Sequence, residues 1–138
     1  MPSEVIDVRP GDAADAALDA VQALLAGGRL EEALTQLAAL HPADQAAVIA
    51  ELEDEHQAAL LPRIPHQAMA EILEYLEEEP RRHIIGQLEP AAIGPILDRV
   101  ERDVAADVLH QLPPEQSRQA LSAMRTATEV APLLPHAD

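Results

Sequence analysis

Carboxylates are the side chains of this sequence whose spacing could support chemistry. Asp103 and Asp107 are four residues apart, so an α-helix through them would place both on one face. Glu71 and Glu74 form a second pair, three residues apart. Hard divalent cations such as Mg²⁺ take oxygen ligands and keep several waters, so each pair could hold such an ion loosely, preferably shared with another surface. The alternative is that Asp103 is a helix-start residue and Asp107 an ordinary exposed one.

Other constellations that support catalysis are missing from the sequence. It contains no glycine-rich phosphate loop and no nucleophile elbow, and its few serines and threonines form no Ser/His/Asp arrangement. No two of the six histidines are four residues apart. Cysteine is absent, which excludes disulfides and a thiolate metal site. We therefore expect that the chain is not an enzyme.

The chain is strongly acidic, with 25 acidic and nine basic residues and a net charge of −16. A nucleic acid is an unsuitable partner, because binding its phosphates needs clustered Lys and Arg. The opening MPSEVIDVRPGD lacks the apolar stretch of a secretory signal, and no apolar run approaches the roughly 20 residues of a membrane span. We expect a soluble, cytoplasmic chain without direct membrane insertion.

A twelve-residue repeat supplies the elements that must position these carboxylates. Each block ends on an apolar residue and carries an apolar pair three and four residues earlier, a pattern that lies on one face of an α-helix. The final residues of seven consecutive blocks are Leu52, Ile64, Leu76, Leu88, Val100, Leu112 and Met124. Helices this short are stable only when packed on one another. The repeat therefore predicts an all-α solenoid whose core consists of positions 8, 9 and 12 of each block.

The blocks alternate in the way that they begin. Those starting at 41, 65, 89 and 113 open with proline, and those starting at 53, 77 and 101 open with acidic residues. Both residue types favour the first turn of a helix. The larger unit is therefore a 24-residue helical hairpin, and in a regular stack the acidic openings would form a negative ridge along one edge.

The repeat also divides the chain. Residues 1–11 are expected to be a flexible leader, residues 12–124 the α-solenoid, and residues 125–138 a tail or a linker to absent downstream domains. Gly27 and Gly28 should end the first helix. Pro62 should end its helix early, and Gly94 with Pro95 should delay or kink the helix of the block that starts at 89.

Residues 41–124 resemble the cytoplasmic N-terminal domain of MgtE-type magnesium transporters. The resemblance depends on the LEP and LPP turns and on three longer segments: LHPADQAAVIAEL at 40–52, QAMAEILEYL at 67–76 and RDVAADVLHQLPPEQ at 102–116. The order of LHP, DVAADVL and LPPE is its most discriminating part. The resemblance implies a right-handed superhelix of short helices.

In that family, paired CBS domains, a connecting helix and a membrane bundle follow the N-terminal domain. Magnesium bound between the N-terminal and CBS domains closes the pore when intracellular Mg²⁺ is high. The positions that match the family's ligands are Asp103, Asp107 and Glu71, which would bind Mg²⁺ weakly and share it with a partner domain. Val104 stands where the family often has a second consecutive acid, so one possible ligand is missing.

The resemblance implies a regulatory, Mg²⁺-sensing domain on the cytoplasmic face of the inner membrane, in a parent transporter that is a homodimer. The chain contains neither CBS domains nor a membrane bundle, so it would not transport the ion alone. The alternative is a free-standing acidic helical scaffold, either an adaptor or a protein like the middle domain of flagellar motor switch proteins. A response to millimolar Mg²⁺ would separate the two.

Overall fold

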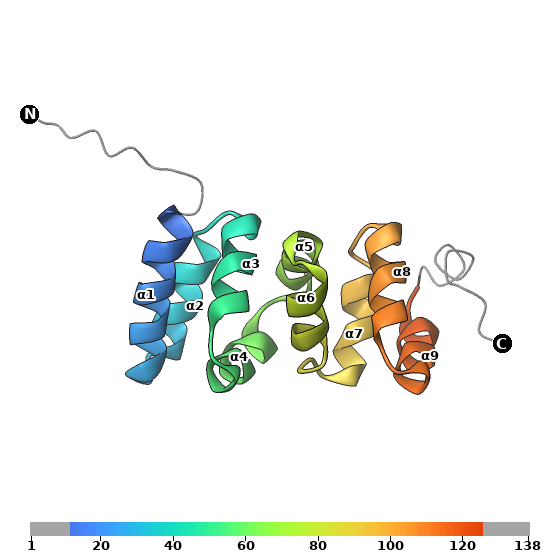
Figure 1. Cartoon of the computed structure of the whole chain (residues 1–138). Coiled ribbons are helices and arrows are strands. Elements are labelled where there is room, and N and C mark those ends of the chain that lie inside the picture. Colours follow the sequence, from blue (N-terminus) through green and yellow to red (C-terminus); the bar gives the residue numbers. More distant parts are fainter. Residues whose placement is uncertain (1–11, 126–138) are drawn as a thin grey trace, which may run out of the picture.

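The computed structural model describes residues 12–125, which form nine α-helices and one short 3₁₀ helix and contain no strand (Figure 1). The predicted leader and tail lie outside these residues, except for Arg125. The helices are α1 (Asp12–Ala26), α2 (Leu30–Ala38), α3 (Pro42–Glu51), α4 (Asp54–Leu60), η1 (Leu61–Arg63), α5 (His66–Tyr75), α6 (Glu78–Ile85), α7 (Pro90–Leu97), α8 (Arg102–Gln111) and α9 (Pro114–Ala123). The all-α fold is confirmed. No helix within residues 12–125 is long and apolar enough to cross a membrane.

Helix starts follow the twelve-residue period from α3 to α9. Proline occupies the first turn of α3, α7 and α9, where its missing N–H would have no helical partner. The helices α4, α6 and α8 begin after the extended residues Glu53, Glu77 and Glu101. Acidic residues follow in the first turn of all three, where they interact favourably with the helix dipole.

The last apolar position of each block lies just outside the helix rather than on its face. Five of these residues have an extended backbone and are buried: Leu52, Ile64, Leu76, Leu112 and Met124. The expected spacing is therefore present, but it marks a buried residue in the turn. The apolar pairs at positions 8 and 9 do lie within the helices, and both members of the pairs 48–49, 72–73 and 108–109 are at most 1% exposed.

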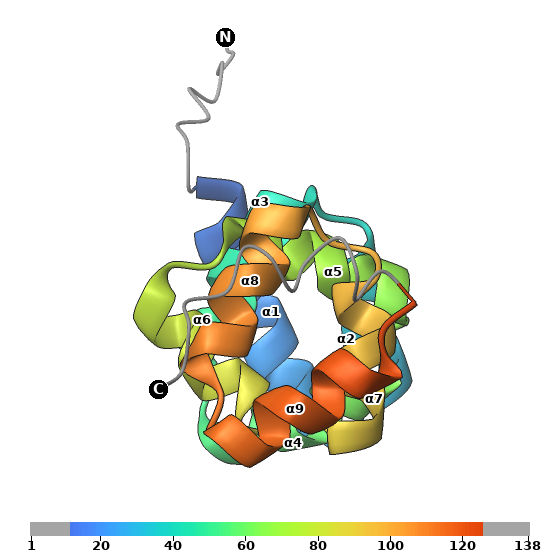
Figure 2. The same ribbon diagram turned by 90° about the vertical axis from the view of Figure 1, so that its right-hand side faces the viewer.

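Alternate helices pack on each other in two rows. The odd-numbered helices contact one another in the order α1, α3, α5, α7 and α9, and in the other row α2 contacts α4 and α6 contacts α8. Figure 2, which looks along the stack from the α9 end, shows the two rows surrounding a common axis. The buried apolar residues are all Ala, Val, Ile, Leu or Met, so small aliphatic side chains form the core as expected.

The predicted helix breakers act differently from one another. Gly28 has a φ of +76° and follows the end of α1, and Pro62 ends α4 early and leads into η1. Of the two effects expected of Gly94 and Pro95, the delayed helix start is wrong, because α7 begins at Pro90 and contains Pro95, and the kink stays a prediction. Gly94 is buried and faces α9, where a Cβ at this position would lie 2.6 Å from Cβ of Ala123. This glycine permits a close approach of the two helices.

Candidate metal site on α8

Asp103 and Asp107 lie on one exposed face of α8, separated by one helical turn. Asp103 is in the first turn and Asp107 is in the middle of the helix, with its side chain 67% exposed. The start of α8 is held by a neighbouring repeat, because the backbone N–H of Glu101 donates to Oε2 of Glu74 at 3.1 Å. Both carboxylates therefore lie on one face of the helix, as their spacing predicted, and both are exposed to solvent.

Arg81 of α6 lies beside this pair. Its Nη2 is 4.0 Å from Oδ2 of Asp107, and its Nε donates to Oε1 of Gln111 at 2.9 Å. The Arg81 side chain is only 12% exposed, and Gln111 in turn donates through Nε2 to the carbonyl oxygen of Glu78 at 2.9 Å. A positive charge is thus fixed next to Asp107, and it opposes a cation that binds there.

Glu71 lies apart from this pair, on α5. Its side chain is exposed, and Oε2 accepts a hydrogen bond from Nε2 of Gln67 at 3.3 Å. Its predicted companion Glu74 instead accepts a hydrogen bond from the backbone N–H of Glu101, the residue before α8. Among residues 12–125, no group of three or more His, Asp or Glu side chains comes together as a possible metal site. Glu71 therefore does not complete a site with Asp103 and Asp107 within this chain.

The residues of α8 suit Mg²⁺ in type but not in number. Carboxylate oxygens are the donors that this hard cation takes, whereas its octahedral shell needs six ligands. Two exposed carboxylates can supply part of that shell, and water or a second surface must supply the rest. The α8 pair is thus at most half of a metal site.

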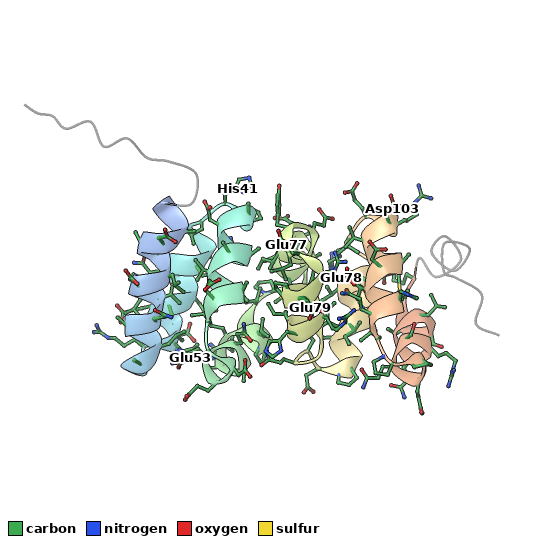
Figure 3. The ribbon with its side chains drawn as sticks, viewed as in Figure 1. His41, Glu53, Glu77, Glu78, Glu79 and Asp103 are labelled. Carbon is green, nitrogen blue, oxygen red and sulfur yellow. The ribbon has the colours of Figure 1, made fainter. Side chains whose placement is uncertain are left out.

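The predicted acidic ridge is not a straight edge. In Figure 3, Glu53 lies low in the stack, Glu77 to Glu79 lie at mid-height and Asp103 lies near the top, so the acidic openings follow a diagonal. Arg82 also neutralises part of their charge, because it pairs with Glu79 at 2.7 Å and with Glu78 at 3.3 Å. Asp54 is in hydrogen-bond contact with His83, whose Nε2 lies 2.8 Å from its Oδ1.

A second 24-residue pattern, of polar contacts, links α4, α6 and α8. Gln57 is 2% exposed, and its Oε1 accepts from Nε2 of Gln87 at 2.6 Å. The equivalent residues 24 positions later are Arg81 and Gln111, which make the corresponding contact. The helical spacing of the carboxylates did not identify Arg81 as a neighbour of Asp107. The common 24-residue spacing of these four residues was the signal that could have found it.

A family model described as the MgtE intracellular N domain matches residues 40–136, which is more than half of the chain. A solved structure entitled "Crystal structure of the soluble part of a magnesium transporter" superimposes with a TM-score of 0.76 at 21% sequence identity. The match covers 91% of this chain and 50% of that one, so this chain spans about half of its length. No curated protein matches the chain significantly.

Proposed function

Because this chain belongs to the MgtE intracellular N domain family, we propose that it is the Mg²⁺-sensing regulatory domain of an MgtE-like magnesium transporter. Such a domain acts on the cytoplasmic side of the membrane and does not transport the ion alone. The observation that carries the proposal is the pair Asp103 and Asp107, exposed one turn apart on α8. No catalytic role is assigned to the domain.

The α8 pair requires a partner surface for its function. Two carboxylates leave most of the coordination shell of Mg²⁺ to water or to oxygen donors from elsewhere. We assign those donors to other acidic parts of the parent transporter, namely its CBS domains, in a parent that is a homodimer. Glu71, on a different helix, would contribute to a second shared site and not to the α8 site.

The regulatory mechanism is electrostatic. The chain carries a net charge of −16, so at low Mg²⁺ an acidic surface of the same transporter repels it and the domain moves away. At high Mg²⁺, ions shared between Asp103, Asp107 and the partner surface stabilise the docked arrangement. The ion acts by binding one arrangement more tightly than the other, which shifts their populations.

Mg²⁺ inhibition of the intact parent transporter tests this proposal. A double substitution Asp103→Ala/Asp107→Ala should raise the Mg²⁺ concentration that half-closes the pore. The double substitution Glu55→Ala/Glu115→Ala is a matched control, because it removes two exposed acidic residues from the first turns of α4 and α9. Equal inhibition curves for the two variants would refute the α8 site. A transporter with no response to millimolar Mg²⁺ would favour the scaffold alternative.

A further inference from the structure

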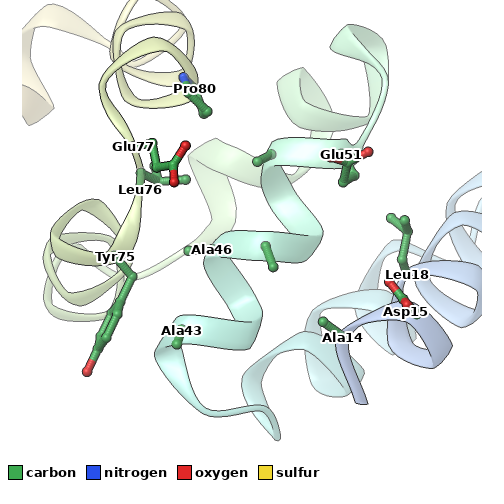
Figure 4. A pocket seen from close by; sticks show the side chains of 12 residues that line it. Ala14, Asp15, Leu18, Ala43, Ala46, Glu51, Tyr75, Leu76, Glu77 and Pro80 are labelled. Carbon is green, nitrogen blue, oxygen red and sulfur yellow. The ribbon is translucent and has the colours of Figure 1, made fainter. Parts of the chain in front are cut away.

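A groove with a volume of about 460 Å³ opens between α1, α3 and the turn that joins α5 to α6 (Figure 4). Its floor is made of small side chains from one stripe of α3: Ala43, Ala46, Ala47 and Ala50. Leu18 of α1 lies on one side of this floor, and Leu76 and Pro80 lie on the other. The volume falls within the roughly 300–1,000 Å³ that is usual for ligand pockets. A floor of alanines lets the backbone of another element approach α3 closely.

The charged residues that line the groove are all acidic. They are Asp15 of α1, Glu51 at the end of α3, and Glu77 before α6. All three are exposed, and none makes an ion pair with a described residue. Elsewhere on the molecule, Glu31, Glu78 and Glu79 are paired with arginines. The groove thus combines an apolar floor with an uncompensated negative rim, which favours a cationic occupant.

Tyr75 adds an aromatic wall to the groove. It is the one large hydrophobic residue among those described that is exposed, at 53%. Its ring packs edge-on against His41, with centroids 5.6 Å apart and an interplanar angle of 72°, so the ring is supported on one side. A supported aromatic ring beside an acidic groove offers contact area to apolar side chains and a face to a positive charge.

We propose that this groove binds a basic amphipathic helix of a partner protein. The alanine stripe follows the i, i+3, i+4, i+7 spacing that another helix face can match, and the acidic rim fits Lys or Arg on the flanks of that helix. A second copy of this chain is a poor occupant, because its charge of −16 would place acidic residues against the acidic rim. The inference does not depend on Mg²⁺ sensing, because the groove shares no residue with α8.

Three synthetic peptides of 18 residues test the proposal with the isolated protein. The first forms a helix with Ala and Leu on one face and Lys on the other; the second has the same composition in scrambled order; the third replaces every Lys with Glu. Binding is followed by NMR of the alanine methyl groups. The first peptide alone should bind, with the largest shifts at Ala46, Ala47 and Ala50. No binding, equal binding of the scrambled peptide, or shifts spread over all acidic faces would overturn the proposal.

Three variants separate groove binding from general charge attraction. Glu51→Gln/Glu77→Gln should weaken binding about three- to tenfold, since two exposed ion pairs are lost. Glu55→Gln/Glu115→Gln removes the same charge outside the groove and should change the affinity less than twofold. Ala47→Trp fills an exposed position of the floor, so it should abolish binding while the protein stays folded by circular dichroism. Equal weakening by both double variants, or unchanged binding of Ala47→Trp, would refute the assignment.

Sedimentation of the protein without peptide identifies a competing occupant. A monomer is the expected result. A dimer that Ala47→Trp dissociates would assign the groove to a second copy and overturn the proposal. Loss of Mg²⁺ inhibition in the transporter would leave the peptide result unchanged, so the two proposals fail independently.

Discussion

Replacing Arg81 with glutamine should strengthen the binding of a divalent cation to Asp103 and Asp107 about fivefold. Arg81 is largely buried and fixed by Gln111, with its Nη2 4.0 Å from Asp107. Its charge therefore remains beside the site and opposes an arriving cation. Glutamine removes the charge and keeps a polar group that can bond to Gln111, so the contact between α6 and α8 is changed as little as possible.

The expected magnitude follows from Coulomb's law. A cation bound to Asp107 would lie roughly 5 Å from the guanidinium of Arg81, and in water a divalent and a unit charge at that distance repel by about 1.7 kcal/mol. Screening at physiological ionic strength, with a Debye length of about 8 Å, lowers this repulsion to about 1 kcal/mol, or about fivefold in affinity. The solvent value of the dielectric constant is appropriate because the Asp107 side chain is 67% exposed.

Mn²⁺ is a suitable probe, because it takes the same oxygen ligands and broadens NMR signals of nearby nuclei. The titration is followed at the amide signals of Asp103 and Asp107 in the wild-type protein and in Arg81→Gln. Arg29→Gln is the control, since Arg29 pairs with Glu32 near α2 at the opposite end of the stack. Equal gains in Mn²⁺ affinity in Arg81→Gln and Arg29→Gln would show that only the total charge of the protein matters. An unchanged affinity in Arg81→Gln would refute the reasoning.

Three further predictions concern stability and are checked by thermal and urea unfolding. Gly94→Ala should destabilise the protein by about 1–3 kcal/mol because its Cβ would clash with Ala123, whereas Gly86→Ala, with contacts no closer than 3.5 Å, should stabilise it by up to about 1 kcal/mol. A Gly94→Ala variant as stable as Gly86→Ala would disprove the close approach. Gln57→Ala should cost about 1–3 kcal/mol, because it removes two hydrogen bonds, leaving Nε2 of Gln87 without this acceptor and the carbonyl of Ile49 with only its backbone donor, and a loss below about 0.5 kcal/mol would contradict this estimate. Leu109→Asp places a charge at a position that is 1% exposed, so the cooperative melt should disappear.

The helix order could be predicted from the sequence because its signals are local. Proline and acidic residues at the block starts act within one turn of the backbone, and they fix the seven helix starts from α3 to α9. The apolar pairs mark the buried face for the same reason. For Leu52 and its equivalents, the periodicity predicts a position on the helix face, whereas they lie just after the helix end, because a residue at i+4 satisfies the periodicity in either place.

In the candidate site, too, the features that depend on one helix could be predicted, and those that depend on helix packing could not. The i, i+4 relation of Asp103 and Asp107 is internal to one helix, so the sequence was sufficient to place them together. The neighbourhood of Arg81 depends on how α6 lies against α8, and its only trace in the sequence is the 24-residue spacing of Gln57, Arg81, Gln87 and Gln111, not a pattern within one helix. The diagonal course of the acidic openings likewise results from the rotation between successive repeats, a quantity that the length of the period does not contain. The handedness of the superhelix stays a prediction.

The exposed position of Tyr75 determines which optical signals this protein can give. The chain has one tyrosine and no tryptophan or phenylalanine, so all of its aromatic absorbance and emission come from a ring at the edge of the α3 groove. Because that ring is already 53% exposed in the folded state, unfolding changes its contact with solvent less than it would for a buried ring. Intrinsic fluorescence is therefore a poor monitor of unfolding for this protein and a selective reporter of what occupies the groove.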